Sequence, residues 1–196
     1  MLDLSRLEAG RLPIDPVRQE LAITLDAAII EVNGLAQSRQ LRIDRAGERS
    51  MTAWYDPARI AQVLTNVIGN AVKFSTPGGV ITVSLGHAEA ADGSPLAEVV
   101  VTDSGIGIPE SERESIFDKF VQSSKTSTGA GGTGLGLAIS REIIHAHGGS
   151  IRAEDNPVGG ARFVFTLPRN PPAALPGSAT GPGASTERDR PDSHAA

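Results

Sequence analysis

Apolar residues recur at intervals of three and four positions in three stretches of the chain, which is the spacing of a helix with one buried face. Asp56-Pro57 supplies an N-cap and a proline at the first position of the middle stretch. Gly148-Gly149 closes the last stretch. The sequence therefore predicts three long helices and a shorter one: Glu20–Ser38, Pro57–Phe74 and Leu135–His147, with the short helix at Pro109–Phe117.

Short runs rich in branched apolar residues, bounded by turn residues, predict strands between these helices. The predicted strands are Leu12–Val17, Leu41–Arg45, Met51–Tyr55, Val80–Leu85, Glu98–Thr102, Ser150–Glu154 and Ala161–Leu167. Strands and helices interleave without a strict strand-helix-strand order. This pattern favours a two-layer α/β sandwich with a mixed sheet over a doubly wound parallel fold.

The two ends of the chain differ from this middle part. Residues 168–196 are rich in proline and glycine, with Leu175 as the one large aliphatic side chain. Such a segment cannot bury enough apolar surface to offset its ordering entropy, so we predict a disordered tail. Residues 1–11 contain a short helical pattern over Met1–Ala9, too short to be stable alone, which suggests the end of a longer helix. The predicted folded domain is 12–167.

Composition narrows the functional classes. Acidic residues exceed basic ones, giving a net charge of −5, so binding of nucleic acid by bulk charge is not expected. The chain has no cysteine, which excludes disulfides and cysteine-based metal sites. No apolar run approaches the roughly 20 residues that span a bilayer. We expect a cytoplasmic protein.

The predicted helix over 57–74 has an unusual polar face. Asn66 and Asn70 lie one turn apart, with Gln62 and Lys73 on the same side. Asparagine is a poor residue inside a helix, but its amide oxygen is a suitable ligand for Mg²⁺. Taken alone, the pattern leaves open either a metal and phosphate site or an ordinary solvated face.

Two glycine-containing turns carry further candidate chemistry. Asp103 follows a buried strand and precedes Gly105 and Gly107, so it is either a hydrogen-bond acceptor for an exocyclic amine or part of an ordinary turn. Five glycines between Gly129 and Gly136 run directly into a helix, which is typical of a phosphate site but also of a flexible loop. This loop lacks the Lys-Ser/Thr of a Walker A motif, and no strand precedes it as in a Rossmann turn.

Together, in this order and spacing, the motifs resemble the N, G1, F and G2 boxes of the catalytic domain of sensor histidine kinases. The matching segments are Asn66–Phe74, Asp103–Pro109, Phe117–Phe120 and Gly132–Leu137. The resemblance covers residues 12–167 and implies the Bergerat ATP-binding fold, a mixed sheet of about five strands with about three helices on one face. It also implies that residues 1–11 are the end of a dimerisation helix.

The resemblance implies ATP and Mg²⁺ as cofactors and assigns roles to single residues. Asn70 would bind Mg²⁺, with Asn66 supporting the metal or the phosphates, and Lys73 would reach the phosphates. The glycine-rich loop and the start of the following helix would wrap the phosphates through Gly132, Thr133, Gly134, Leu135 and Gly136.

For the base, Asp103 would receive the adenine amino group, and Phe74 would pack near the adenine or ribose. Gly105, Gly107 and Ile108 would form the turn on which the base is seated.

Phe117 and Phe120 would couple a mobile lid, Val121–Thr133, to the domain. Where members of the family often carry arginines around the lid, this chain has Lys119 and Lys125. The cation that meets the γ-phosphate therefore stays open.

The same family transfers the γ-phosphoryl group of ATP to a histidine on a dimerisation domain, for relay to the receiver domain of a response regulator. None of the four histidines here stands in the sequence context of that acceptor, so we expect no catalytic residue of this kind within the chain. The acceptor would lie on a dimerisation domain in a longer, homodimeric parent kinase or on another chain. Whether that parent is membrane-anchored stays open.

Two alternatives share the fold. One is an ATP hydrolase, in which a glutamate one turn before the metal-binding asparagine activates water. Here that position is Asn66, whose amide cannot accept a proton at neutral pH. The other is an ATP-binding regulatory module similar to anti-sigma factors, against which the phenylalanine pair and the helix stub argue without excluding it.

Overall fold

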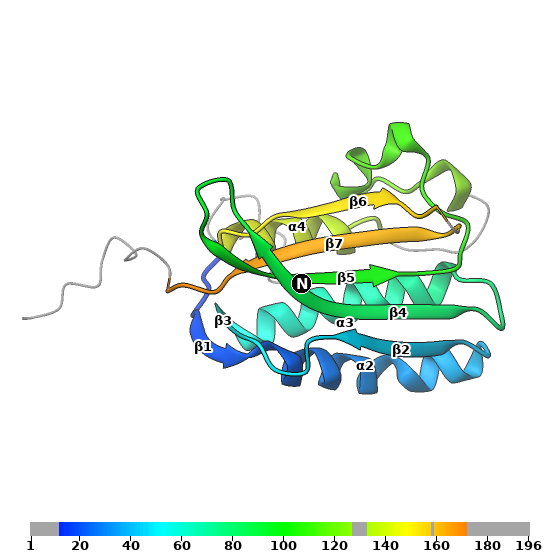
Figure 1. The fold of residues 1–196 in the computed structure, drawn as a ribbon. Coiled ribbons are helices and arrows are strands. Elements are labelled where there is room, and N and C mark those ends of the chain that lie inside the picture. Colours follow the sequence, from blue (N-terminus) through cyan, green and yellow to red (C-terminus); the bar gives the residue numbers. More distant parts are fainter. Residues whose placement is uncertain (1–11, 127–132, 158, 172–196) are drawn as a thin grey trace, which may run out of the picture.

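The computed structural model describes residues 12–126, 133–157 and 159–171, and its main sheet has five strands. The strand order is β2 (Arg42–Gly47), β4 (Val80–Glu89), β5 (Pro95–Thr102), β7 (Ala161–Pro168) and β6 (Ile151–Asp155). The pair β2–β4 is parallel and the other pairs are antiparallel, so the sheet is mixed. Three described helices cover one face, α2 (Leu21–Ser38), α3 (Pro57–Phe74) and α4 (Gly136–Ala146), as Figure 1 shows. The predicted two-layer α/β sandwich is confirmed.

A separate two-stranded ribbon joins the start of the described chain to the segment before α3. It pairs β1 (Val17–Glu20) with β3 (Thr52–Tyr55) in antiparallel register. The prediction of a strand over Leu12–Val17 was wrong, because the strand begins where that range ends. Pro13 and Pro16 lack the N–H that a ladder needs, and pairing starts directly after the second of them.

Helix α3 is the central element of the helical layer. Its N-cap is Asp56, whose carboxylate accepts hydrogen bonds from the backbone N–H groups of Ala58 (3.1 Å) and Arg59 (3.2 Å), as the sequence predicted. One face of the helix is fully buried against the sheet and its neighbours, including the predicted apolar arc of Ile60, Leu64, Val67, Ile68 and Ala71. Burial of this arc fixes the rotation of the helix, so the face with Asn66 and Asn70 is directed away from the core.

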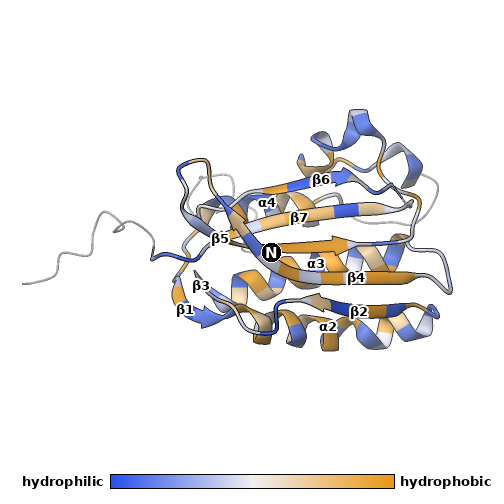
Figure 2. Cartoon of the chain, in the orientation of Figure 1, coloured by the Kyte–Doolittle hydropathy of each residue, from blue (hydrophilic) through white to orange (hydrophobic). Residues whose placement is uncertain are grey.

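Strands β4 and β5 extend beyond their predicted ranges and form a long hairpin. Their register runs from Thr82↔Thr102 to Glu89↔Pro95. Figure 2 shows apolar residues along both strands where they face the helices. The predicted helix Pro109–Phe117 was wrong, because the chain forms two 3₁₀ turns, Glu110–Glu112 and Ser115–Phe117. Only Ile116 and Phe117 are buried in this charged segment, too few for an amphipathic helix.

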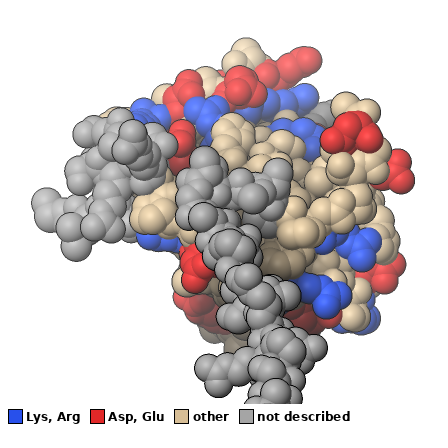
Figure 3. Space-filling model, turned by 90° about the vertical axis from the view of Figure 1, so that its left-hand side faces the viewer, with Lys and Arg blue, Asp and Glu red and all other residues tan. Residues whose placement is uncertain are grey.

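Charged side chains of both signs lie interspersed on the face shown in Figure 3. On the sheet, Arg152 and Arg162 both pair with Glu154, at 2.7 and 2.8 Å. Among the described helices, none combines the length and the apolar character that a membrane-spanning segment needs.

Candidate ATP-binding site

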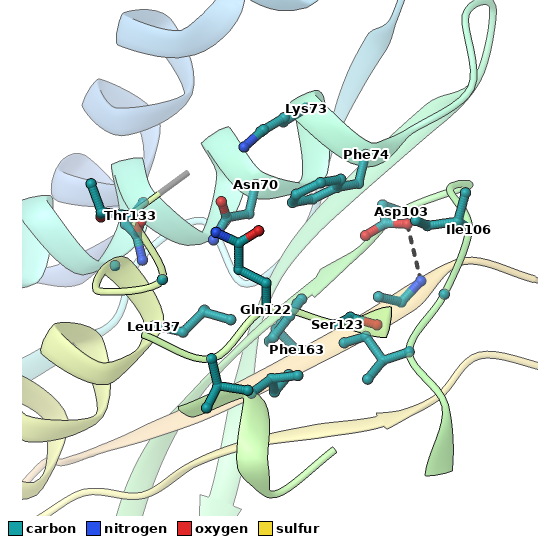
Figure 4. A pocket seen from close by; sticks show the side chains of 18 residues that line it. Asn70, Lys73, Phe74, Asp103, Ile106, Gln122, Ser123, Thr133, Leu137 and Phe163 are labelled. Atoms are coloured by element: carbon teal, nitrogen blue, oxygen red, sulfur yellow. Dashed lines mark hydrogen bonds between the residues drawn. The ribbon is translucent and has the colours of Figure 1, made fainter. Parts of the chain in front are cut away.

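A cavity of about 270 Å³ lies where α3, the loop after β5, β7 and the start of α4 meet. Most of the side chains predicted to bind ATP line this cavity, although they are up to 70 positions apart in the sequence. They are Asn66, Asn70, Lys73, Phe74, Asp103, Gly107, Ile108, Thr133, Gly134 and Gly136. Figure 4 shows Asp103 and Ile106 at one end of the cavity and Asn70 and Thr133 at the other.

Asp103 defines the first end. The residue is 5 % exposed, and its Oδ1 accepts hydrogen bonds from the backbone N–H groups of Gly105 (2.8 Å) and Ala161 (3.0 Å). Burial raises the pKa of the Asp103 carboxyl above its usual value, although both hydrogen bonds act in the opposite direction. Within the described residues we find no hydrogen bond to Oδ2. This oxygen can therefore accept one from a ligand in the cavity.

Gly105 does not line the cavity but holds the turn that forms its rim. Its backbone pairs with Ser75 just beyond the end of α3. A Cβ at this position would lie 2.3 Å from the carbonyl oxygen of Phe74, so the close approach of turn and helix requires a glycine. Gly105 thus connects the Asp103 turn to the helix that carries Asn66 and Asn70.

The cavity also has apolar walls, which the sequence analysis did not predict. Ile106, Ile116, Leu137, Ala161 and Phe163 also line the cavity. Phe163 packs edge-on against Phe117, with ring centroids 6.2 Å apart. Ala161 and Phe163 are alternate residues on β7 and therefore lie on the same face of the strand. The sequence pattern shows that they share a face, but it does not show that this face lines a cavity. Apolar walls of this kind suit the flat faces of a base.

The second end combines the polar face of α3 with the N-terminus of α4. Asn66 Nδ2 donates to Ser140 Oγ (2.9 Å), and Ser140 Oγ donates to the carbonyl oxygen of Gly136 (3.0 Å). A Cβ on Gly136 would lie 2.3 Å from Asn66 Oδ1. Asn66 therefore ties the first turn of α4 to α3, and the positive end of the α4 dipole faces the cavity.

Asn70 differs from Asn66 in having its side chain available. Its amide is directed into the cavity, and we find no hydrogen bond to it within the described residues. The described ranges contain no group of three or more His, Cys, Asp or Glu side chains that could hold a metal. Any divalent ion here would be bound by amide oxygens together with oxygens of the ligand itself, which suits Mg²⁺.

Positive charge is sparse around the cavity. Lys73 is the one basic side chain among the described residues that line it, and its Nζ lies 4.9 Å from the centroid of the Phe74 ring. Lys119 is not among the lining residues. Lys125 Nζ instead donates to the carbonyl oxygen of Ile106, at 2.9 Å.

The two phenylalanines of the F-box-like motif have different environments. Phe117 is 1 % exposed and lies beneath the cavity wall, with Arg141 over its ring. Phe120 is 67 % exposed, does not line the cavity and has a positive φ of 66°. Its backbone N–H donates to the carbonyl oxygen of Gly134 (2.9 Å), so the segment is tied to the start of α4 through its backbone.

Two predicted residues remain. Leu135 precedes α4 as its N-cap and does not line the cavity. Gly132 lies outside the described residues, as does the rest of 127–132; of the predicted lid the structure describes 121–126 and Thr133.

Comparison with known proteins agrees with this geometry. The family model described as "Histidine kinase-, DNA gyrase B-, and HSP90-like ATPase" matches residues 55–171, which include all the residues that line the cavity. Hybrid signal transduction histidine kinase D of Dictyostelium discoideum is 37 % identical over 174 residues, covering 87 % of this chain and 11 % of that protein. Sensor histidine kinase WalK of Bacillus subtilis is 43 % identical over 122 residues, covering 62 % of this chain and 20 % of that protein.

Solved structures of histidine kinases share the fold. The mycobacterial sensor histidine kinase MprB matches with a TM-score of 0.68 and 27 % identity, covering 80 % of this chain and 99 % of that one. Full-length ShkA, in complex with AMPPNP, matches with a TM-score of 0.72 and 29 % identity, covering 87 % of this chain and 34 % of that one. The chain spans 11–32 % of the length of curated relatives such as histidine kinase D and WalK. The family model matches more than half of the chain, and a relative that covers 87 % of the chain is 37 % identical to it, so the chain belongs to the family of histidine kinase-, DNA gyrase B- and HSP90-like ATPases.

Proposed function

We propose that this chain is the catalytic part of a sensor histidine kinase, which holds ATP and Mg²⁺ and transfers the γ-phosphoryl group to a histidine on a dimerisation domain. The phosphoryl group would then pass to the receiver domain of a response regulator. The observation that supports this function is a single cavity with a buried carboxylate at one end and a helix N-terminus at the other. These are suitable partners for an amino-substituted base and for phosphates.

In this proposal the adenine lies between the apolar walls with its amino group toward Asp103 Oδ2. The triphosphate extends toward Gly134 and Gly136, where the backbone of the glycine-rich turn and the α4 dipole favour negative charge. Lys73 supplies the nearby cation. A guanine base would place a carbonyl oxygen opposite the Asp103 carboxylate, so the site selects adenine.

Asn70 is the proposed ligand of Mg²⁺, and its amide, which is directed into the cavity, fits this role. The ion would neutralise part of the charge on the phosphates when it is bound. Asn66 can contribute its Oδ1 at most, because its nitrogen donates to Ser140. Its main contribution is to hold α4 in place.

The described histidines are unsuitable acceptors. His87 on β4 is paired with Ala97, six residues along β5 from Asp103, which corresponds to roughly 20 Å. His145 lies nine residues along α4 from Gly136, which corresponds to about 13 Å from the phosphate end. His147 is 7 % exposed, and both its ring nitrogens are engaged, with the backbone of Asp56 and Ile143. The nucleophile would therefore be supplied by a dimerisation domain, in cis in a longer homodimeric kinase or in trans.

Asn66 also favours transfer over hydrolysis. A hydrolase of this fold needs a general base one turn before the metal ligand, and an amide that donates to a serine cannot remove a proton from water. Phosphoryl transfer depends mainly on positioning and charge stabilisation, which the cavity can provide without such a base.

The test is incubation of the chain with γ-labelled ATP and Mg²⁺, alone and together with a histidine-bearing dimerisation domain. We expect an acid-labile, base-stable phosphohistidine on the added domain, no stable label on this chain, and loss of transfer in Asn70→Ala. Brisk phosphate release by the isolated chain, abolished by changing Asn66, would support a hydrolase instead.

A further inference from the structure

The described segment Val121–Lys125 forms one wall of the cavity, and side-chain hydrogen bonds attach it to the rest of the domain. Val121, Gln122 and Ser123 line the cavity, and Ser124 begins a short 3₁₀ turn. A segment with so little secondary structure depends on its attachments for its position.

One attachment is the carboxylate of Glu112, in the turn that follows the Asp103 loop. Its oxygens accept hydrogen bonds from Ser123 Oγ (2.5 Å) and the backbone N–H of Ser124 (3.1 Å). These bonds hold the pKa of Glu112 below its usual value. The centre of the Val121–Lys125 wall is thus bound to the 3₁₀ turn Glu110–Glu112, which follows the Asp103 loop in the sequence.

The other attachment is Lys125, one of the two lysines that the sequence analysis considered for the γ-phosphate. Its Nζ donates to the carbonyl oxygen of Ile106 at 2.9 Å. Ile106 lies three residues after Asp103 and lines the same end of the cavity. Ile106 and Asp103 lie at one end of the cavity, across from Asn70 and Thr133 (Figure 4). The hydrogen bond to Ile106 therefore places the ammonium group of Lys125 at the Asp103 end.

We propose that Lys125 is a positioning residue for the base and not a phosphate ligand. Its hydrogen bond to Ile106 holds the Val121–Lys125 wall against the turn that carries Asp103, and so closes the side of the base-binding end. This inference rests on the proposed function, since it takes the Asp103 end as the site of adenine. It leaves Lys73 as the lysine that meets the phosphates.

The two roles predict different dependence on the number of phosphates in the ligand. Loss of this hydrogen bond at the base end should weaken the binding of adenosine, ADP and a non-hydrolysable ATP analogue by the same factor. The factor is about three, because solvent weakens a charged interaction of an exposed side chain. Loss of a phosphate ligand weakens ADP and the analogue but not adenosine.

The experiment is a titration of the full chain with each of the three ligands and Mg²⁺, followed by NMR, which measures the millimolar affinity expected of adenosine. The variants are Lys125→Met, Lys125→Arg and Lys73→Met, and the matched control is Lys119→Met, which removes an equal charge outside the cavity. Backbone spectra confirm that each variant is folded.

We expect Lys125→Met to weaken all three ligands equally, Lys125→Arg to restore most of the loss because it keeps a donor, and Lys119→Met to match the parent. Lys73→Met should weaken ADP and the analogue alone. The inference is overturned if Lys125→Met spares adenosine while weakening the nucleotides, or changes none of the three. A parent chain that binds neither ADP nor the analogue would contradict the proposed function itself, and this inference with it.

Discussion

Replacing Asp103 by asparagine should separate nucleotide binding from folding stability. In the parent chain Asp103 Oδ1 accepts from Gly105 and Ala161, and Oδ2 is left for the ligand. The Oδ1 of asparagine can keep both backbone hydrogen bonds, which places Nδ2 toward the cavity. There it would meet the adenine amino group donor to donor.

The expected loss of affinity follows from this exchange. A hydrogen bond to a charged group contributes about 1.5–3 kcal/mol, so Asp103→Asn should bind the ATP analogue roughly 10- to 150-fold more weakly. An inosine nucleotide, which has an acceptor where adenine has its amino group, should gain relative to ATP. Isothermal titration with both nucleotides measures this change in preference.

Stability should change in the opposite direction. Because burial raises the pKa of Asp103, the ionised carboxylate costs folding free energy at neutral pH, and a neutral amide removes that cost. Asp103→Asn should therefore resist urea at least as well as the parent at pH 7.5. The control Asp103→Ala loses the acceptor for two backbone N–H groups and should be less stable, by about 1–3 kcal/mol for each group left unpaired. Unchanged ATP affinity in Asp103→Asn, or a stability as low as that of the alanine variant, would refute this reasoning.

Two further predictions concern the packing of α4. His147 accepts a hydrogen bond from the backbone N–H of the N-cap Asp56, and burial lowers the pKa of its imidazole. The free energy of unfolding should therefore keep its full value above about pH 6.5, the pKa of an unperturbed histidine, and fall as the pH drops below it. Urea unfolding at pH 7.5 and 5.5 measures this loss of stability. The loss should be smaller in His147→Asn and unchanged in the control His145→Gln. Equal losses in the two variants would argue against a role of His147 in the pH dependence. Gly136→Ala should displace the Asn66 amide, because the new Cβ would lie 2.3 Å from Asn66 Oδ1. The hydrogen bond from Asn66 to Ser140 would then be lost, and binding of the ATP analogue should weaken about tenfold. Its control, Gly34→Ala in α2, meets no atom within 4 Å and should gain about 1 kcal/mol of stability with binding unchanged, so equal binding by the two variants would exclude the expected displacement.

The parts of the fold predicted correctly from the sequence are those set by local periodicity and capping. The cap at Asp56 and the buried arc from Ile60 to Ala71 gave α3 its start and its orientation, and hence the direction of Asn66 and Asn70. The prediction failed where polar residues or prolines interrupt an apolar pattern. The first strand begins at Val17, after the prolines, and the charged segment after Pro109 forms 3₁₀ turns and not the predicted helix.

Among the residues that line the cavity, the sequence indicated those whose type is unusual for their position, such as the mid-helix asparagines Asn66 and Asn70 and Gly107 after Asp103. It did not indicate ordinary residues that reach the cavity only through the fold. Phe163 reaches the cavity because β7 pairs with β5, and Lys125 bonds to Ile106 through a contact 19 positions away. Neither relation leaves a local pattern in the sequence.

The most direct test of the central claim is a crystal structure of this chain with Mg²⁺ and a non-hydrolysable ATP analogue. The account predicts the adenine amino group within hydrogen-bond distance of Asp103 Oδ2, the metal bound by Asn70 Oδ1, and the phosphates at Gly134 and Gly136. A nucleotide with its base at the Asn70 end, or bound outside this cavity, would contradict it.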